Sequence, residues 1–251
     1  MQHSVAPTPS PTLTVVTVVR NGAAHIARTV ESALAQDYPA LELVVVDGAS
    51  TDGTLAALAP WRTRLAQLVS EPDRGIYDAM NKGLRLATGE FVVFMNCGDV
   101  FASPTAVSAV MADVAGGREQ VVFARWARRV QGKPDLACTP DLAAGFFNHQ
   151  AVVYSRAIHR WHGDYLSVPG LSTADYLFFA TLLDSPAVQC RTSDTLLAVI
   201  DVDGLSSGLQ TFSQKHAADY LVGRTSRLKL AAVLLLHPLY SMLKRWLRGR
   251  R

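Results

Sequence analysis

The chain has few cysteines and no metal-binding cysteine motif. Its 251 residues include only three, Cys97, Cys138 and Cys190, which lie far apart and form no CxxC pair. This spacing excludes the common zinc motifs, and the odd number argues against a disulfide framework. A reducing, cytoplasmic compartment is therefore predicted.

The sequence also lacks the glycine-rich loops that usually hold phosphates. It contains no GxxxxGK[ST] sequence, and the turn after the first predicted strand does not carry GxGxxG. P-loop nucleotide binding and the usual dinucleotide site are therefore excluded. The phosphates of any bound nucleotide must be neutralised in another way, and a divalent metal held by a carboxylate is the obvious candidate.

Long hydrophobic runs and concentrated charge are scarce. The apolar segment Leu230–Leu243 is interrupted by His237 and Pro238, and it is shorter than the roughly 18 residues that a membrane span needs. The formal net charge is only +3, and five of the last eight residues are basic, so the rest of the chain is nearly neutral. We predict no nucleic acid partner, because the body carries no basic stripe. Residues 224–251 instead predict an amphipathic basic tail, either on an anionic membrane surface or packed on protein.

Hydrophobic residues are plentiful, at 49% of the chain, so a sizeable core can form. Residues 1–11 are a Ser/Pro/Thr-rich run, which predicts a disordered N-terminus rather than a secretory signal. We predict one domain over residues 12–223, with halves at 12–104 and 105–223.

The first half alternates apolar strands with helical patterns. Strands are predicted at Leu13–Val19, Leu41–Val46, Gln67–Val69 and Phe91–Met95. Helices are predicted between them, the second beginning at a Thr51 or Asp52 N-cap. Together these predict an α/β fold with a mostly parallel central sheet and helices on both faces. After Thr105 the pattern loosens, which predicts a mixed C-terminal half where the sheet changes direction.

Polar residues follow each of these four strands. In open α/β sheets, ligands bind beyond the carboxyl ends of the strands, so we expect these residues to form one site. Asp47 directly follows a buried strand and could accept a hydrogen bond from a base or a ribose. Asp and Asn also favour turns and helix caps, and for Asp52 a cap is the better interpretation.

The stretch FVVFMNCGD, residues 91–99, ends a buried strand on a single carboxylate. Gly98 allows the backbone to turn sharply, so Asp99 is predicted at a solvent-facing rim, where a substitution should spare the fold. An oxygen ligand at such a position suits Mg²⁺ or Mn²⁺. The alternative is an ordinary turn aspartate.

Four motifs resemble family 2 glycosyltransferases of the nucleotide-sugar transferase A fold, particularly bacterial polysaccharide transferases of the colanic-acid type. They are VVDGASTDGT, SEPDRGIYDAMNKGLRLATGEFVVFMNCGD, NHQAVVYSR and TADYLFFATLL, and the resemblance covers residues 13–206. It implies an inverting enzyme that uses a nucleotide diphosphate sugar and Mg²⁺ or Mn²⁺. Residues 12–104 would then bind the donor and residues 105–223 the acceptor.

The resemblance also implies roles for individual residues. The implied substrate-binding residues are Asn21, Asp47, Asp73, Arg74, Asn81, Asn96, Gly98, His149 and Gln150, with Asp99 as metal ligand and Asp175 as catalytic base. A helix cap is the alternative for Asp175. The family's DxD-like site often has two adjacent carboxylates where this chain has Gly98 and Asp99, so the identity of the donor stays open.

The predicted function is transfer of a sugar to a hydroxyl of a glycan acceptor, lipid-linked by expectation, in bacterial surface polysaccharide synthesis. The enzyme is predicted to be cytoplasmic and peripheral on the inner face of the plasma membrane. An inactive nucleotide-sugar-binding scaffold is the alternative, which the retention of Asp99, His149 and Asp175 disfavours. A sugar nucleotidyltransferase is less favoured, because such an enzyme would normally carry a basic glycine-rich loop.

Overall fold

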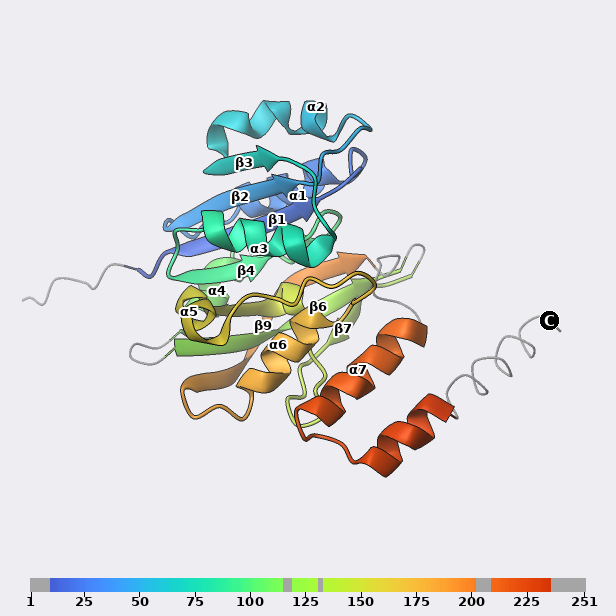
Figure 1. The fold of residues 1–251 in the computed structure, drawn as a ribbon. Coiled ribbons are helices and arrows are strands. Elements are labelled where there is room, and N and C mark those ends of the chain that lie inside the picture. Colours follow the sequence, from blue (N-terminus) through green and yellow to red (C-terminus); the bar gives the residue numbers. More distant parts are fainter. Residues whose placement is uncertain (1–9, 115–118, 131–132, 202–208, 236–251) are drawn as a thin grey trace, which may run out of the picture.

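The computed structural model describes residues 10–114, 119–130, 133–201 and 209–235. Four parallel strands form one side of the central sheet, in the order β3-β2-β1-β4 (Figure 1). Their bounds are β1 Leu13–Val19, β2 Leu41–Asp47, β3 Gln67–Ser70 and β4 Phe91–Phe94. The connecting helices are α1 Ile26–Leu34, α2 Thr54–Leu58, the 3-10 helix η1 Ala59–Arg64, and α3 Ile76–Leu86. The predicted parallel arrangement is confirmed.

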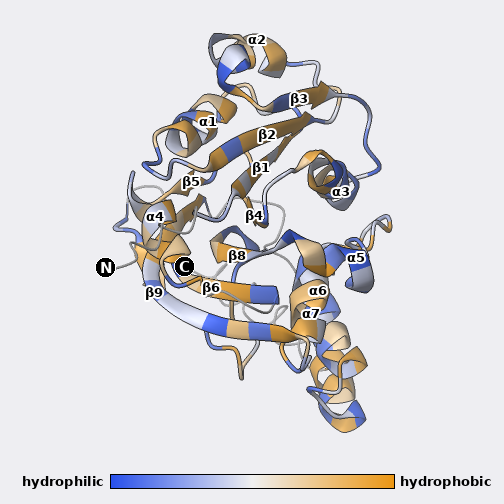
Figure 2. Ribbon diagram, turned by 90° about the vertical axis from the view of Figure 1, so that its left-hand side faces the viewer, coloured by the Kyte–Doolittle hydropathy of each residue, from blue (hydrophilic) through white to orange (hydrophobic). Residues whose placement is uncertain are grey.

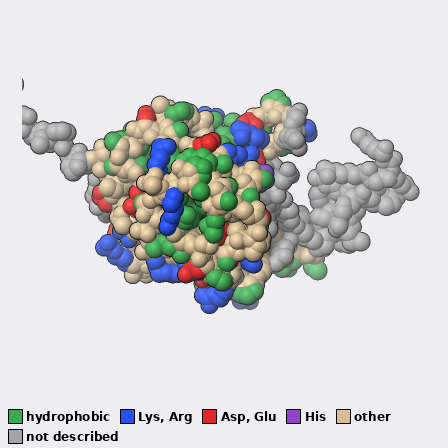
Figure 3. Space-filling view, turned by 90° about the horizontal axis from the view of Figure 1, so that it is seen from above, with side chains coloured by type: hydrophobic (Ala, Val, Ile, Leu, Met, Phe, Trp, Pro, Cys, Tyr) green, Lys and Arg blue, Asp and Glu red, His purple; other side chains and the backbone are tan. Residues whose placement is uncertain are grey.

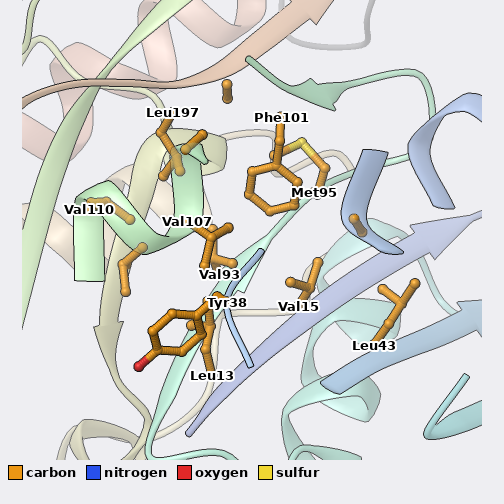
Figure 4. Packing of buried hydrophobic residues seen from close by; sticks show 14 of the residues in the cluster. Leu13, Val15, Tyr38, Leu43, Val93, Met95, Phe101, Val107, Val110 and Leu197 are labelled. Atoms are coloured by element: carbon orange, nitrogen blue, oxygen red, sulfur yellow. The ribbon is translucent and has the colours of Figure 1, made fainter. Parts of the chain in front are cut away.

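These strands are apolar throughout because both faces of the sheet are covered. Val15 and Val93 point to the face that carries α1 and α4 (Ala106–Met111), whereas Val16 and Val44 point to the face that carries α3. Figure 2 shows the curled sheet between these two sets of helices. In Figure 4, Val93 of β4 lies beside Val107 of α4, and Val15 of β1 and Leu43 of β2 belong to the same buried cluster. This double burial holds the carboxyl ends of the four strands in a fixed register.

The second half of the sheet has mixed direction, as predicted. Beyond β4 the order is β8-β6-β9-β5, and β7 pairs with β6 outside this path. Strand β8 is antiparallel to both β4 and β6, while β6 and β9 are parallel. The bounds are β5 Val100–Phe101, β6 Glu119–Arg129, β7 Leu136–Cys138, β8 Val152–Ser155 and β9 Val188–Asp201.

Short helices connect these strands, and most of them cover the face that also carries α3. They are the 3-10 helices η2 His149–Ala151 and η3 Arg156–Ile158, together with α5 His159–His162 and α6 Ala174–Leu182. Helix α7 (Leu209–Leu221) packs on α6 through Tyr176, Ala180 and Ala218. Helix α6 therefore lies between the sheet and α7, and its first turn is close to the end of β4.

Two local predictions need correction. The N-cap of α2 is Gly53, with φ 91°, rather than Thr51 or Asp52. The Asp52 carboxylate still accepts a hydrogen bond from the Thr54 amide at 3.1 Å, so it lies one position before the cap. Strand β9 was not predicted, because its first half is largely polar.

The predictions for the two ends of the chain fall largely outside the described residues, which exclude 1–9 and 236–251. Residues 227–235 are helical. No helix in the described part of the chain is both long and apolar enough to cross a membrane. On the face above α2 and β3, the described Lys and Arg side chains are interspersed with Asp and Glu (Figure 3).

Candidate active site

The loops after β1, β2 and β3 are joined by side chains predicted to bind the nucleotide. Asn21 has a positive φ of 51°, and its Oδ1 accepts a hydrogen bond from the Thr51 amide at 2.9 Å. Gly48 is required where it stands, because a Cβ there would lie 2.1 Å from Asp73 Oδ2. Asn21 and Asp73 thus each contact the loop after β2.

Asp47 lies beneath these loops and is fully buried. Its Oδ2 accepts hydrogen bonds from the Ser50 amide at 3.0 Å and from Ser70 Oγ at 2.6 Å. Its Oδ1 is buried without a hydrogen-bond partner within the described structure. A buried carboxylate oxygen normally has a donor, so this oxygen could accept one from a ligand.

Two other predicted binding residues have contacts within the protein. The Arg74 side chain is 82% exposed, and its guanidinium pairs with Asp78, with Nη2 and Oδ1 separated by 3.2 Å. Asn81 is buried. Its Nδ2 donates a hydrogen bond to the Tyr165 carbonyl at 2.8 Å, and its Oδ1 accepts one from the Tyr165 backbone amide at 3.0 Å. These contacts give Asn81 a structural role, and its substrate contact stays a prediction.

The turn after β4 brings Asp99 into contact with the C-terminal half. Gly98 has φ 104°, and its amide donates to Thr29 Oγ1 at 3.0 Å. Asp99 Oδ2 accepts a hydrogen bond from Gln150 Nε2 at 2.7 Å, and Oδ1 accepts one from the Asp201 amide at 3.1 Å. Asp99 is only 6% exposed, so the predicted solvent-facing position is wrong. Residues of η2 and β9, far along the chain, cover it.

Burial raises the pKa of Asp99 to about 6, although the hydrogen bonds from Asp201 and Gln150 favour the charged form. A nearby cation would favour that form further. Two amide oxygens in this region, Asn96 Oδ1 and Gln150 Oε1, are buried without partners in the described structure. Oxygen atoms of this kind suit Mg²⁺ or Mn²⁺. The residues present therefore fit a divalent ion held by the single carboxylate of Asp99.

The described residues contain no cluster of three or more His, Cys, Asp or Glu side chains that could hold a metal ion. A divalent ion at Asp99 would consequently need most of its ligands from a bound diphosphate and from water, which is how Mg²⁺ is commonly bound at phosphate sites.

Asp175 is held by two hydrogen-bond donors from different parts of the chain. The N-cap of α6 is Thr173, so Asp175 lies within the first turn and is not the cap. Its Oδ2 lies 2.6 Å from His149 Nδ1, and its Oδ1 accepts from the Tyr77 hydroxyl at 2.7 Å. The side chain is 17% exposed, so solvent reaches part of it.

The pKa of Asp175 lies below its usual value of 3.8. Burial would raise this pKa, but the charge and hydrogen bond of His149, with the hydrogen bond of Tyr77, outweigh burial. The carboxylate is therefore ionised at neutral pH and able to accept a proton.

His149 connects Asp175 to the end of β4. Its Nε2 lies within hydrogen-bond distance of Asn96 Nδ2, at 3.1 Å. Its Nδ1 faces the ionised carboxylate of Asp175, which can only accept, so Nδ1 donates to it. The structure thus brings together five predicted site residues in two connected groups, Asn96–His149–Asp175 and Asp99–Gln150.

Sequence reasoning missed several residues of this region. Tyr77 lies inside the quoted motif SEPDRGIYDAMNKG, so its position was available but its partner was not. Asp201 could not have been found, because it contacts Asp99 from 102 residues away on the unpredicted strand β9. Its carboxylate forms an ion pair with Arg28 of α1.

Comparison with known proteins gives a family match over most of the domain. The profile described as Glycosyl transferase family 2 matches residues 14–165. A "PGL/p-HBAD biosynthesis glycosyltransferase" from Mycobacterium bovis is 27% identical over 203 residues, covering 75% of this chain and 76% of the relative. An "Uncharacterized glycosyltransferase" from Mycobacterium tuberculosis is 37% identical over 110 residues. That match covers 43% of this chain and 42% of the relative, so it spans less than half of either protein.

Solved structures show the same fold. S. aureus TarS residues 1–349 in complex with UDP superposes with a TM-score of 0.66 at 19% identity, over 88% of this chain and 68% of that one. The mannosyltransferase PcManGT from Pyrobaculum calidifontis, in complex with GDP-Man and Mn²⁺, gives a TM-score of 0.67 at 24% identity, over 92% and 72%. The predicted nucleotide-sugar transferase A fold is confirmed by these likenesses.

Proposed function

Because this chain belongs to glycosyl transferase family 2, as its motifs predicted, we propose that it transfers a sugar from a nucleotide diphosphate sugar to a hydroxyl of a glycan acceptor. The transfer inverts the anomeric centre and serves bacterial surface polysaccharide synthesis. Names of relatives support this role: besides the M. bovis protein, a "Putative teichuronic acid biosynthesis glycosyltransferase TuaG" of Bacillus subtilis is 35% identical over 92 residues, which cover 36% of each protein.

The observation that carries the proposal is the position of Asp175. It is an ionised carboxylate, partly open to solvent, and hydrogen-bonded to His149 and Tyr77. Through His149 it is connected to Asn96 at the end of β4, beside the predicted donor site. A general base in this reaction has to lie close to the reacting sugar and accept a proton at neutral pH, and the ionised state of Asp175 and its connection to the end of β4 support that role.

The reaction is a single displacement. The acceptor oxygen forms a bond to the anomeric carbon on the face opposite the diphosphate, while the bond from that carbon to the diphosphate oxygen breaks and its electron pair leaves with the diphosphate. Asp175 takes the proton of the acceptor hydroxyl as the oxygen attacks. Attack from the opposite face inverts the configuration.

Asp99 would hold Mg²⁺ or Mn²⁺. When bound, the ion supplies positive charge that stabilises the leaving diphosphate. Gln150 donates to Asp99 Oδ2 and so orients its carboxylate. This role of Asp99 is supported by its burial without a charged partner among the described ion pairs, and by the unpartnered oxygens of Asn96 and Gln150.

The nucleotide would lie over the loops after β1, β2 and β3. The unpartnered Oδ1 of Asp47 supports a contact with the base or the ribose, and Asn21 and Asp73 lie on the loops beside it. Gly98 leaves room where related enzymes often carry a second carboxylate. We propose no particular sugar, and UDP, GDP and dTDP are all candidate nucleotides.

A panel of nucleotide sugars tests the function directly. Release of the nucleoside diphosphate is measured with and without Mn²⁺, using UDP-, GDP- and dTDP-sugars and simple alkyl glycosides as acceptors, for the wild type and Asp175→Asn. Mn²⁺-dependent release that the variant loses supports the proposal. Mn²⁺-dependent binding with no release by the wild type favours the nucleotide-sugar-binding scaffold, and formation of a nucleotide sugar from a sugar phosphate favours the nucleotidyltransferase.

We also propose that the C-terminal tail brings the enzyme to the inner membrane surface, where a lipid-linked acceptor would be presented. Within the helical residues 227–235, Leu228 is 84% exposed and Leu235 is 71% exposed. Five basic residues follow at 244–251, each worth about 1 kcal/mol near an anionic surface.

Sedimentation with vesicles tests the membrane proposal. Full-length protein should sediment with phosphatidylserine-containing vesicles at low salt. Added salt should release the protein from the vesicles, because salt screens the attraction between the basic residues and the anionic lipid. A chain ending at residue 229 should remain in the supernatant and retain donor hydrolysis. Full-length protein that stays in the supernatant at low salt would show that this segment packs on protein instead.

A further inference from the structure

The Tyr77 side chain lies at the contact between the two halves of the domain. It is the second residue of α3, it is 6% exposed, and its hydroxyl donates to Asp175 Oδ1 at 2.7 Å. Its partner is 98 residues further along the chain. The donor half of the domain therefore contacts the base directly, in addition to the contact through Asn96 and His149.

We propose that Tyr77 is a positioning residue for the catalytic base, holding one carboxylate oxygen of Asp175 while His149 holds the other. The inference rests on the proposed function. The terminal torsion of an aspartate side chain is soft and would let the carboxylate rotate. Donors on both oxygens remove that freedom, so the carboxylate keeps one orientation toward the acceptor hydroxyl.

The surroundings of Tyr77 hold its ring in place. The ring contacts that of Tyr165, with centroids 6.1 Å apart and planes tilted by 37°. It also lines a small hollow of about 70 Å³ between Arg74 and residues 167–171. Gly75, with φ 127°, is the N-cap of α3 and lies two residues before Tyr77. A ring fixed in this way can hold its hydroxyl on one oxygen of its partner.

The chemistry of the hydroxyl fits a permanent donor. Burial raises the pKa of Tyr77 far above 10, and the neighbouring charge of Asp175 raises it further, so the phenol stays protonated. The groups that bond Asp175 are Tyr77 from α3, His149 from η2 and the Tyr176 backbone amide of α6, and Tyr165 from the segment before α6 is close enough for the charge of Asp175 to raise its pKa. The Tyr77 hydrogen bond stabilises the carboxylate form, so its loss should raise the pKa of Asp175.

The test compares Tyr77→Phe with Tyr176→Phe. Tyr176 is a matched control, since it is also buried and its hydroxyl donates to Asp219 of α7 rather than to Asp175. The substitution Tyr176→Phe keeps the backbone amide that donates to Asp175. With the best donor of the panel, Tyr77→Phe should lower kcat by about tenfold to a hundredfold and leave the KM values for donor and acceptor within about twofold. The acid limb of its pH–rate profile should move to higher pH. Tyr176→Phe should change neither the rate nor the profile.

A second measurement does not depend on turnover. Carbon-13 NMR titration of the aspartate carboxyl groups should give a higher pKa for Asp175 in Tyr77→Phe than in the wild type, and an unchanged pKa in Tyr176→Phe. An unchanged pKa in Tyr77→Phe overturns the inference, whether or not the enzyme turns over.

The failures of the two proposals are distinguishable. If Asp175→Asn loses transfer while Tyr77→Phe keeps the wild-type kcat, only the role of Tyr77 is wrong. If Asp175→Asn transfers normally, the base assignment itself is wrong. A raised KM with an unchanged kcat in Tyr77→Phe would make Tyr77 a substrate contact and would also overturn the positioning role.

Discussion

The parallel half and the mixed half of the domain differ in how their residues reach the site. In the parallel half, β1 to β4 bring their loops to one edge of the sheet, so Asp47 ends β2 there, and Asn21 and Asp99 lie in the loops after β1 and β4. In the mixed half, Asp175 lies on a helix and Asp201 at the end of a 14-residue strand. The comparison teaches that the site lies at the junction of the halves, and neither half is complete alone.

Replacing Asp175, the proposed base in the mixed half, should have the largest effect on the rate of transfer. Asp175→Asn removes the proton acceptor, so transfer should slow by about 10²-fold or more, within the usual range for acid–base catalysis. Nucleotide binding should be unchanged, because the donor loops belong to the other half. Turnover and calorimetry with UDP and GDP measure the two effects. Near-normal transfer would reduce Asp175 to a structural residue.

Replacing Asp99, the proposed metal ligand in the parallel half, should affect donor binding instead. Asp99→Asn should abolish the gain in nucleotide-sugar affinity that Mg²⁺ or Mn²⁺ provides, measured by calorimetry with and without the ion. The asparagine keeps the shape of the side chain, whereas Asp99→Ala would also leave Gln150 and the Asp201 amide unpaired. The alanine variant should therefore lose about 1–3 kcal/mol of unfolding free energy. Metal-dependent affinity that survives in Asp99→Asn would remove Asp99 from the metal site.

A third substitution tests whether Asn81 stabilises the contact between the two halves or binds substrate. Asn81→Ala removes both hydrogen bonds to the Tyr165 backbone, so the unfolding free energy should fall by about 2 kcal/mol in denaturant titrations. Nucleotide affinity should stay within about twofold if Asn81 is purely structural. A large loss of affinity without a loss of stability would restore the substrate contact that the sequence predicted.

The smallest effect is expected at the opposite edge of the parallel half, where Glu42 joins β2 to β1 and to the start of β4. Burial alone would raise the pKa of Glu42, but hydrogen bonds from Thr14, Thr88 and Gly89 outweigh it and lower the pKa below its ordinary 4.5. A group with a lowered folded-state pKa contributes stability above its unfolded pKa and loses it as the pH falls through the folded value.

The unfolding free energy should therefore decline as the pH drops below about 4.5, and Glu42→Gln should flatten that part of the profile by less than about 1 kcal/mol. Urea titrations between pH 3 and 7 measure it. An unchanged slope in the variant would show that other carboxylates cause the acid sensitivity.

The strands of the parallel half could be predicted from the sequence for a physical reason. Strands buried on both faces are uniformly apolar, so Leu13–Val19 was predicted with its observed bounds and the polar residues after each strand were evident. Strand β9 has no such pattern, because its first half is only partly buried. The residues that bring Asp201 to Asp99 could therefore not be predicted.

For the candidate site, the sequence indicated which residues would gather but not how they would contact one another. The pairing of Asp99 with Gln150, and of Asp175 with His149, depends on where η2 lies against β4, which no local pattern encodes. The predicted exposure of Asp99 failed for the same reason. The partner residues that bury it lie more than 50 positions away.

The 3-10 helix η2 has a consequence for how substitutions act. Its adjacent residues serve different carboxylates, His149 contacting Asp175 and Gln150 contacting Asp99. The turn is itself capped by Asn148, whose side chain accepts from the Gln150 amide at 2.9 Å. A displacement of this one turn would alter the support of both carboxylates together, so under the roles proposed for Asp175 and Asp99, proton removal and diphosphate binding would change together. A substitution that displaces η2 is therefore expected to reduce both at once.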